Sequence, residues 1–269
     1  MSPLQVKDIN IGGEEPVFIA GPCVIENETM LDETARFLKD ISSDFKVILK
    51  CSYDKANRSS VNSYRGPGIE EGLRIIAAVR EKYDIPVICD VHCKEDVPVV
   101  AETVDCIQIP AFLCRQTDLL LAAAATGKPV NIKKGQFMSP GAMRMQAEKV
   151  TGVSSNGGVM LTERGSCFGY SDLVVDMRSI IMMKKFGSPV IFDASHSQQK
   201  PPSGDTSETG GADEFIIPLA LASAAVGVDG IFCEIHPDPS NAKSDRATQI
   251  DFDRFSELAE KVRDIKIHK

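Results

Sequence analysis

The chain has 269 residues, of which 43% are hydrophobic and 25% charged, and its formal net charge is −8. This is the composition of a globular protein with a sizeable core, and no apolar run approaches the roughly 20 residues of a membrane span. Because nucleic-acid binding requires clustered positive charge, the acidic balance argues against a nucleic-acid partner, and we expect no membrane partner either.

Short apolar runs recur along the whole chain and predict eight strands. In chain order they are residues 17–20, 47–51, 86–90, 105–109, 129–133, 158–162, 189–193 and 230–234. Helical periodicity fills the stretches between them, for example residues 70–83, 117–126, 172–186, 215–226 and 252–265. Three helices are expected to stop at Gly127, Gly187 and Gly227, because glycine is favoured just past a helix C-terminus.

This alternation predicts parallel strands joined by crossover helices. Eight such units favour closure into a single (β/α)8 (TIM) barrel, with residues 1–269 as one catalytic domain. The alternative is an open doubly wound sheet, but the first turn reads AGPC at 20–23, and no G-x-G-x-x-G motif occurs. Residues 4–12 are expected to form a short hairpin that closes the barrel bottom.

Residues 195–213 interrupt the pattern, because they are rich in Ser, Gly, Pro, Gln and Thr and have no periodicity. A connection this long within a compact barrel is typical of a functional lid. It follows the seventh strand on the strand-to-helix side, where barrel enzymes keep their active sites. We therefore predict a lid over the site.

The cysteines indicate a reducing compartment. Eight are present, neither paired nor regularly spaced, in a chain far longer than a disulfide-stapled scaffold. Cys51, Cys89, Cys106 and Cys233 lie in or beside apolar runs, where a thiol behaves as a small hydrophobe. The first residues contain no apolar segment of a secretion signal. We expect a cytoplasmic protein.

Polar residues at the C-terminal ends of the strands should converge on one mouth of the barrel. All eight predicted strands contribute one, and the set is Cys23, Lys50 with Lys55, Asp90, Gln108, Lys133, Arg164, His196 and Glu234. A single one of them could be a solvated or capping residue. Eight at converging positions predict a site.

One group at this mouth is cationic. It consists of Lys50, Lys55, Arg58, Lys133 and Arg164, and with Gln108 and Ser59 it suits phosphate and carboxylate groups. So many cations would repel one another without an anionic ligand. We therefore expect a doubly phosphorylated ligand or two phosphorylated substrates.

A second group resembles a metal site. Cys23, His196 and Glu234 follow strands that become neighbours when the barrel closes, and Asp238 and Asp245 lie in the loop after the last strand. Thiolate, imidazole and carboxylate form a ligand set for first-row transition metals. The alternative is a buried thiol beside a hydrogen-bonded histidine. The spacing does not choose between the two aspartates.

Eight motifs occur in order along nearly the whole chain. They are AGPC at 20–23, KCSYDKANRSS at 50–60, YRGPG at 64–68, QIPAFLCRQ at 108–116, NIKKGQF at 131–137, TERG at 162–165, FDASHS at 192–197 and EIHP at 234–237. Together they resemble the 3-deoxy-D-manno-octulosonate 8-phosphate synthase family. The resemblance implies a cytoplasmic (β/α)8 homotetramer that condenses phosphoenolpyruvate with D-arabinose 5-phosphate and water. The products would be a lipopolysaccharide precursor and inorganic phosphate.

The resemblance also implies a role for each matching residue. As catalytic residues it implies Lys50, Lys55, Asp90, Cys23 and His196. As ligands of phosphoenolpyruvate it implies Lys50, Lys55, Ser52, Gln108, Lys133 and Arg164. As ligands of the aldose it implies Asn57, Arg58, Ser59 and Asp90, with Phe112 and Arg115 reaching over from a neighbouring subunit.

The position of Cys23 divides this family. Metal-independent members have asparagine there, so Cys23 implies the metal-dependent class, with His196, Glu234 and Asp245 as the other ligands. The choice of Asp245 over Asp238 comes from the resemblance. The divalent ion could be zinc, iron or manganese.

Two other functions remain to be distinguished. One is that of a 3-deoxy-D-arabino-heptulosonate 7-phosphate synthase, which uses erythrose 4-phosphate; that family has Lys-Pro-Arg-Thr where this chain has KANRS at 55–59. The other is that of a non-catalytic sugar-phosphate-binding barrel. The complete set of polar strand ends argues against the latter.

Overall fold

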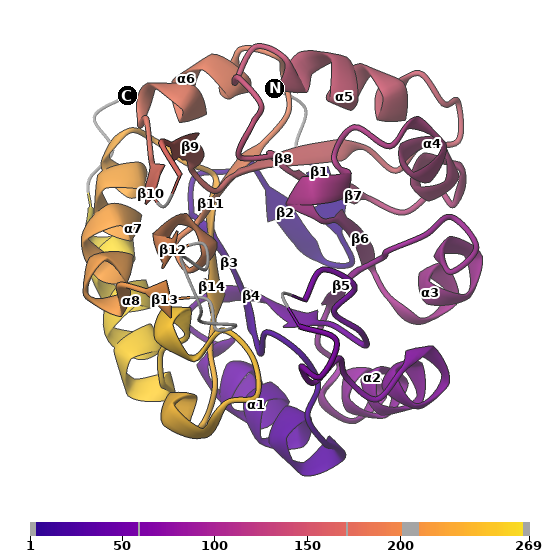
Figure 1. Ribbon diagram of the computed structural model, residues 1–269, viewed down its shortest axis with the longest axis vertical. Helices are drawn as coiled ribbons and strands as arrows, with labels where there is room; N and C mark the ends of the chain where they lie inside the picture. Colours follow the sequence, from indigo (N-terminus) through magenta and orange to yellow (C-terminus); the bar gives the residue numbers. More distant parts are fainter. Residues whose placement is uncertain (1–3, 59, 171, 201–209, 266–269) are drawn as a thin grey trace.

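The computed structural model describes residues 4–265 except 59, 171 and 201–209. Eight strands form a closed barrel in which every neighbouring pair is parallel, in the order β11-β14-β3-β4-β5-β6-β7-β8 (Figure 1). They are β3 (Val17–Gly21), β4 (Lys46–Cys51), β5 (Val87–Asp90), β6 (Cys106–Ile109), β7 (Val130–Lys133), β8 (Val159–Glu163), β11 (Val190–Asp193) and β14 (Gly230–Glu234). The predicted (β/α)8 barrel is confirmed.

Burial on both faces explains why these strands are almost continuously apolar. Apart from Lys46, every residue in them is buried. Successive side chains alternate between the barrel interior and the helix layer. On β3, for example, Ile19 packs in the interior cluster, whereas Phe18 belongs to the cluster shared with the helices.

In the described part of the chain, eight α-helices surround the barrel (Figure 1). They are α1 (Glu28–Ile41), α2 (Ile69–Tyr83), α3 (Val97–Thr103), α4 (Thr117–Ala125), α5 (Met143–Thr151), α6 (Arg178–Lys184), α7 (Ile216–Ala225) and α8 (Phe252–Asp264). Four of the five predicted helices match these bounds to within one residue. Gly127, Gly187 and Gly227 follow α4, α6 and α7 and all have positive φ, so the predicted helix stops are confirmed.

The prediction of one helix over 172–186 is wrong at its start. Residues Ser166–Phe168 (β9) and Asp172–Val174 (β10) pair as an antiparallel hairpin, and α6 begins only at Arg178. The side chain of Asp176 accepts a hydrogen bond from the backbone N–H of Arg178 at 3.0 Å, as a residue at a helix start does. The apolar spacing of residues 172–186 is compatible with one helix, but residues 172–174 form a strand of the hairpin.

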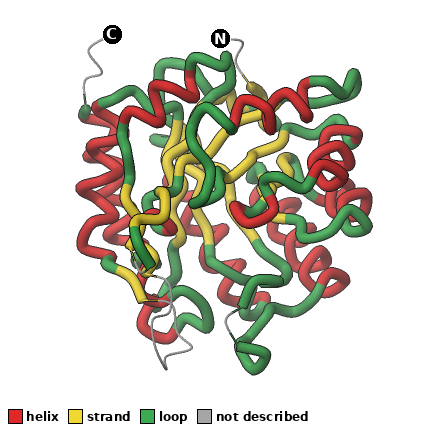
Figure 2. Tube along the Cα trace, turned by 45° about the horizontal axis from the view of Figure 1, so that its top comes forward, coloured by secondary structure: helices red, strands yellow, loops and turns green. Residues whose placement is uncertain are grey.

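The predicted N-terminal hairpin is confirmed. Strands β1 (Leu4–Val6) and β2 (Ile9–Ile11) pair antiparallel. Leu4, Val6 and Ile11 pack in the same apolar cluster as the interior barrel residues Val17 and Ile191. The hairpin therefore closes the end of the barrel at which the strands begin, close to the start of the chain (Figure 2).

The segment after β11 is partly described. It begins with a 3-10 helix (His196–Gln198), followed by β12 (Gln199–Lys200), which pairs antiparallel with β13 (Gly210–Gly211). Residues 201–209 of the predicted lid lie outside the described part. Among the described residues, no helix combines the length and the apolar character that crossing a bilayer would need.

Candidate active site

The C-terminal ends of the strands carry a buried polar layer that faces the barrel interior. On neighbouring strands, the hydroxyl of Thr162 donates to the side chain of Asn131 at 2.6 Å, and Asn131 donates to Gln108 at 3.1 Å. This chain of hydrogen bonds spans β8, β7 and β6. It fixes the side chain of Gln108, one of the predicted phosphate ligands, before any ligand arrives.

Lys50 and Glu234 form an ion pair that is buried almost completely. The ammonium of Lys50 donates to the carbonyl oxygens of Pro22 (3.0 Å) and Cys23 (2.8 Å) and to Oε1 of Glu234 (3.0 Å). The close approach of β3 and β4 requires glycine at position 21, because a Cβ there would lie 2.0 Å from the carbonyl oxygen of Lys50. The other carboxylate oxygen of Glu234, Oε2, is buried and has no hydrogen-bond partner among the described residues.

Burial by itself would favour the neutral carboxyl of Glu234. The nearby His196 and Lys50 outweigh it and lower the pKa of Glu234 to about 2. Glu234 is therefore a carboxylate with one oxygen free for a further cation.

Ser52, Lys55 and Asp90 form a second cluster. The hydroxyl of Ser52 donates to Asp90, and the ammonium of Lys55 lies 2.9 Å from the Ser52 oxygen and 3.5 Å from Oδ2 of Asp90. Burial opposes both charges, yet their mutual attraction holds the pKa of Asp90 below its usual range and that of Lys55 above it. Lys55 therefore stays a cation.

Asp193 is a site residue that the sequence reasoning missed. Its fully buried carboxylate lies 2.6 Å from the Lys133 ammonium and 2.8 Å from Nδ1 of His196. The Lys133 ammonium also lies 3.6 Å from the ring centre of Phe232, and burial lowers its pKa. The position of Asp193 at the end of β11, equivalent to that of Asp90 in β5, could have identified it.

The four residues of the predicted metal site come together. One donor atom from each of Cys23, Glu234 and Asp245 lies within 4.8 Å of the other two. The Nε2 atom of His196 is 3.3 Å from Glu234 and 3.9 Å from Asp245. β11, β14 and β3 are neighbours in the barrel, as predicted.

The neighbours of these groups favour Asp245 over Asp238. Asp238 is exposed and accepts hydrogen bonds from Ser240 and Asn241 in its own turn, both at 2.6 Å. The thiol of Cys23 lies 2.8 Å from the hydroxyl of Ser244, and its burial, followed by the charges of Asp245 and Glu234, raises its pKa. Without a cation, Cys23 is therefore a neutral thiol.

Two guanidinium groups at the mouth have unpaired nitrogens. Arg164 donates from Nη2 to Gln199 at 2.6 Å, whereas its buried Nη1 has no partner in the described part of the chain. Arg58 donates from Nε to the carbonyl oxygen of Tyr64 at 3.0 Å, and its buried Nη2 likewise has no partner among the residues that the structure describes. Buried donors without partners are rare in folded proteins. Both groups are therefore prepared to bind an anion.

The remaining candidates lie at the periphery or are not described. Asn57, Phe112 and Arg115 are exposed, and the last two belong to the connection between β6 and α4. In the described part of the chain they do not join the mouth network. Ser59 lies outside the described residues.

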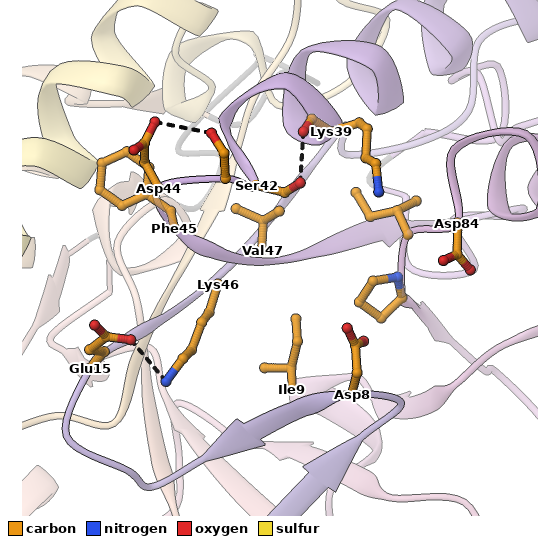
Figure 3. Close-up of a pocket in the computed structure, with 13 residues that line it drawn as sticks. Asp8, Ile9, Glu15, Lys39, Ser42, Asp44, Phe45, Lys46, Val47 and Asp84 are labelled. Atoms are coloured by element: carbon orange, nitrogen blue, oxygen red, sulfur yellow. Dashed lines mark hydrogen bonds and ion pairs between the residues drawn. The ribbon is translucent and has the colours of Figure 1, made fainter.

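A hollow of about 390 Å³ lies at the opposite end of the barrel. It is lined by residues of the β1–β2 hairpin, the end of α1 and the start of β4, including Asp8, Lys39 and Lys46 (Figure 3). Lys46 pairs there with Glu15 at 3.0 Å. None of the described candidate residues lines this hollow, so it is separate from the mouth.

Comparisons with known proteins agree along the whole chain. The sequence model of the DAHP synthetase I family matches residues 1–268. A protein of Koribacter versatilis is 51% identical over 255 residues, which cover 93% of this chain and 91% of the relative. A protein of Fusobacterium nucleatum is 52% identical (91% and 88% covered), and one of Geobacter metallireducens is 48% identical (97% of both chains). All three are named 2-dehydro-3-deoxyphosphooctonate aldolase.

Proposed function

We infer that this chain, which belongs to the DAHP synthetase I family and there to the 2-dehydro-3-deoxyphosphooctonate aldolases, condenses phosphoenolpyruvate with D-arabinose 5-phosphate and water. The products are 3-deoxy-D-manno-octulosonate 8-phosphate and inorganic phosphate. The observation that carries the inference is that Arg58 and Arg164 each have a buried guanidinium nitrogen with no partner among the described residues. Arg58 follows β4 and Arg164 follows β8, and these strands lie opposite each other in the closed barrel.

Two anion sites across one mouth fit two phosphorylated substrates. We assign Arg164, Lys133 and Gln108 to the phosphate of phosphoenolpyruvate, because they occupy adjacent strands. Arg58, with Asn57 and Ser59, takes the aldose, and Asp90 contacts its hydroxyl groups. Phosphate held at both ends would fix the reacting carbons in line, which lowers the entropic part of the barrier.

The reaction forms one carbon–carbon bond and adds one water. The C3 carbon of phosphoenolpyruvate attacks the aldehyde carbon, whose oxygen takes up a proton. Water adds at C2, and inorganic phosphate leaves. Lys50 and Lys55, with Ser52 between Lys55 and Asp90, supply fixed positive charge and hydrogen bonds beside the carboxylate and the reacting oxygens.

A divalent metal fits the cluster of Cys23, His196, Glu234 and Asp245. Oε2 of Glu234 is buried and has no hydrogen-bond partner in the described structure, so this oxygen could coordinate a cation. The Nδ1 atom of His196 lies 2.8 Å from the Asp193 carboxylate, and a proton on Nδ1 shared with Asp193 would leave the Nε2 lone pair for the cluster, the usual arrangement of a metal-binding histidine. When bound, the ion would orient water or polarise the aldehyde. Zinc, iron and manganese all suit this mixed ligand set.

We also propose a homotetramer in the cytoplasm that supplies a lipopolysaccharide precursor. Several large apolar residues are exposed on the loops that follow the neighbouring strands β6, β7 and β8, namely Phe112, Phe137, Phe168 and Tyr170. Large apolar side chains exposed on neighbouring loops are the kind of surface that a contact with another chain would cover. A neighbouring subunit seated there would bring Phe112 and Arg115 to a second mouth.

A turnover assay tests the proposed function. Phosphate release from phosphoenolpyruvate is measured with arabinose 5-phosphate and with erythrose 4-phosphate. We expect a far higher kcat/KM with arabinose 5-phosphate. Preference for erythrose 4-phosphate would assign the heptulosonate reaction instead, and no turnover with either aldose would indicate a non-catalytic barrel.

A further inference from the structure

Behind the phosphate-binding residues lies a second pair of charges that faces away from the mouth. Along β7 and its continuation, Lys133 points into the barrel, so Lys134 points into the helix layer. On β8 and its continuation, Thr162 and Arg164 point inward, and Glu163 points outward. Lys134 and Glu163 are buried almost completely, and their charged groups lie 3.3 Å apart.

This outward pair binds the backbone next to Arg164. The Lys134 ammonium donates to the carbonyl oxygen of Gly165 at 2.9 Å and to the hydroxyl of Ser166 at 3.0 Å. Oε1 of Glu163 accepts a hydrogen bond from the N–H of Gly165 at 2.7 Å, and Oε2 accepts one from Ser179 of α6. Both backbone polar groups of Gly165, which has a φ of 87°, are therefore bonded to the pair.

The side chain of Arg164 has few contacts of its own. Among the described residues, its only hydrogen bond is to Gln199, and its Nη1 has no partner there. Its place at the mouth therefore depends on its backbone, which the bonded residues Glu163 and Gly165 hold on either side.

Stability does not by itself explain an ion pair here. Burying two charges costs desolvation free energy, and apolar residues of similar volume are often at least as stabilising. Among the described residues, the side-chain hydrogen bonds of this pair go to Gly165 after β8, to Ser166 at the start of β9 and to Ser179 of α6. The pair thus fixes geometry.

We propose that Lys134 and Glu163 are positioning residues that hold Arg164 and Lys133 in register for the phosphate of phosphoenolpyruvate. The proposal rests on the proposed function, which assigns that phosphate to Arg164. A displacement of about 1 Å at a substrate-binding group can cost up to about 100-fold in rate. Loss of the pair should therefore weaken the binding of phosphoenolpyruvate far more than the binding of the aldose, because Arg58, which is assigned to the aldose, lies across the barrel.

The decisive variant is Lys134→Met, which keeps the volume and removes the ammonium. We expect KM for phosphoenolpyruvate to rise about tenfold or more, with KM for arabinose 5-phosphate changed by less than about threefold. Lys134→Arg should recover part of the loss. The matched control is Lys184→Met, because Lys184 also bonds a backbone carbonyl and a carboxylate (Gly227 and Asp229), but at the closed end of the barrel. It should lower stability and leave both KM values unchanged.

A milder variant covers the case in which Lys134→Met does not fold. Ser179→Ala removes only the hydroxyl that bonds Glu163, and it should raise KM for phosphoenolpyruvate about threefold. Titration calorimetry with phosphoenolpyruvate alone gives the same comparison without turnover. Unchanged affinity in folded variants, or an equal rise in both KM values, would overturn the positioning role. An unmodified protein that turns over neither aldose would contradict the proposed function instead.

Discussion

Asp193 joins two parts of the mouth that have different proposed tasks. Its carboxylate contacts Lys133, assigned to phosphate, and His196, assigned to metal. Burial opposes the charge, but His196 and Lys133 keep the pKa of Asp193 well below its usual range. A bound phosphate that pairs with Lys133 would therefore weaken the contact between Lys133 and Asp193. Because Asp193 also contacts His196, this would change the charge next to His196.

The two arginines, each with one nitrogen that has no partner among the described residues, lead to a prediction about the KM for each substrate. Arg164→Ala should raise KM for phosphoenolpyruvate, and Arg58→Ala should mainly affect arabinose 5-phosphate. Each loses a charge-assisted contact, which is typically worth about 1.5–3 kcal/mol. Steady-state kinetics with each substrate varied in turn measures the split. Swapped effects would reverse the assignment of the two anion sites.

The metal cluster leads to a second prediction. A chelator should abolish activity, and added divalent metal should restore it. Cys23→Ala should contain little metal by elemental analysis and be nearly inactive, because the thiolate is the soft ligand of the set.

Cys23→Asn is the sharper comparison, since an amide cannot supply a thiolate but can hydrogen-bond a water. If the metal mainly organises the site, this variant should keep some activity that chelators do not change. Chelator resistance of the unmodified protein would favour the alternative, in which Cys23 is a buried thiol bonded to Ser244.

At the scale of elements, the hairpin β9–β10 shows how local pattern and tertiary contact can disagree. Residues 172–177 have apolar spacing that is compatible with a helix. The chain instead turns back at Gly169, which has positive φ, and pairs Leu173 with Cys167. The N–H of Cys167 also donates to the carbonyl oxygen of Gln136 at 3.0 Å. This contact with the β7 side of the barrel has no signal in the local sequence.

The β12 strand supports the prediction of a lid. Gln199 accepts a hydrogen bond from Arg164 at 2.6 Å and donates one to Asp245 at 2.7 Å. It therefore touches both the phosphate side and the metal side of the mouth. We expect residues 195–213 to gain protection from hydrogen exchange when both substrates or an inhibitor bind. Unchanged exchange at a saturated site would make this segment an ordinary loop.

At the scale of the whole molecule, an acidic chain carries a cationic mouth. The net charge of −8 is a sum over the whole chain. Closure of the barrel nevertheless collects four cations, Lys50, Lys55, Lys133 and Arg164, at one end. Glu234, Asp90 and Asp193 pair internally with Lys50, Lys55 and Lys133, whereas Arg164 has no carboxylate at ion-pair distance among the described residues. Anionic substrates then compete with carboxylates for the same cations.

The exposed aromatic residues Phe112, Phe137, Phe168 and Tyr170 lead to a prediction about the proposed homotetramer. Light scattering should give about four times the chain mass of 29.2 kDa. Phe168→Glu should reduce this mass, because a charge cannot be buried without a partner, and should raise KM for arabinose 5-phosphate as Arg115 leaves the neighbouring mouth. Phe215→Glu changes an exposed phenylalanine beside α7 and should leave the mass unchanged. A monomeric unmodified protein would contradict the proposed tetramer.

The barrel and most of the polar residues at its mouth can be predicted from the order of apolar runs and helical stretches. Eight apolar runs separated by helical stretches predict parallel strands with crossovers, and polar residues near the C-terminal ends of the strands then gather at one end of the barrel. Lys50, Asp90, Gln108, Lys133 and Glu234 could be found this way, because they lie at or next to the last residue of their strands.

The pairing of the charged residues, by contrast, follows from the folded barrel. Asp245 approaches Cys23 across a sequence separation of 222 residues, whereas Asp238 bonds within its own turn. Asp193 and Lys133 meet across β8, which lies between their strands, and Lys134 finds Glu163 only in the helix layer. Ion-pair partners are set by distances of a few ångströms between side chains from different strands. Local sequence carries no record of those distances until the closed barrel fixes them.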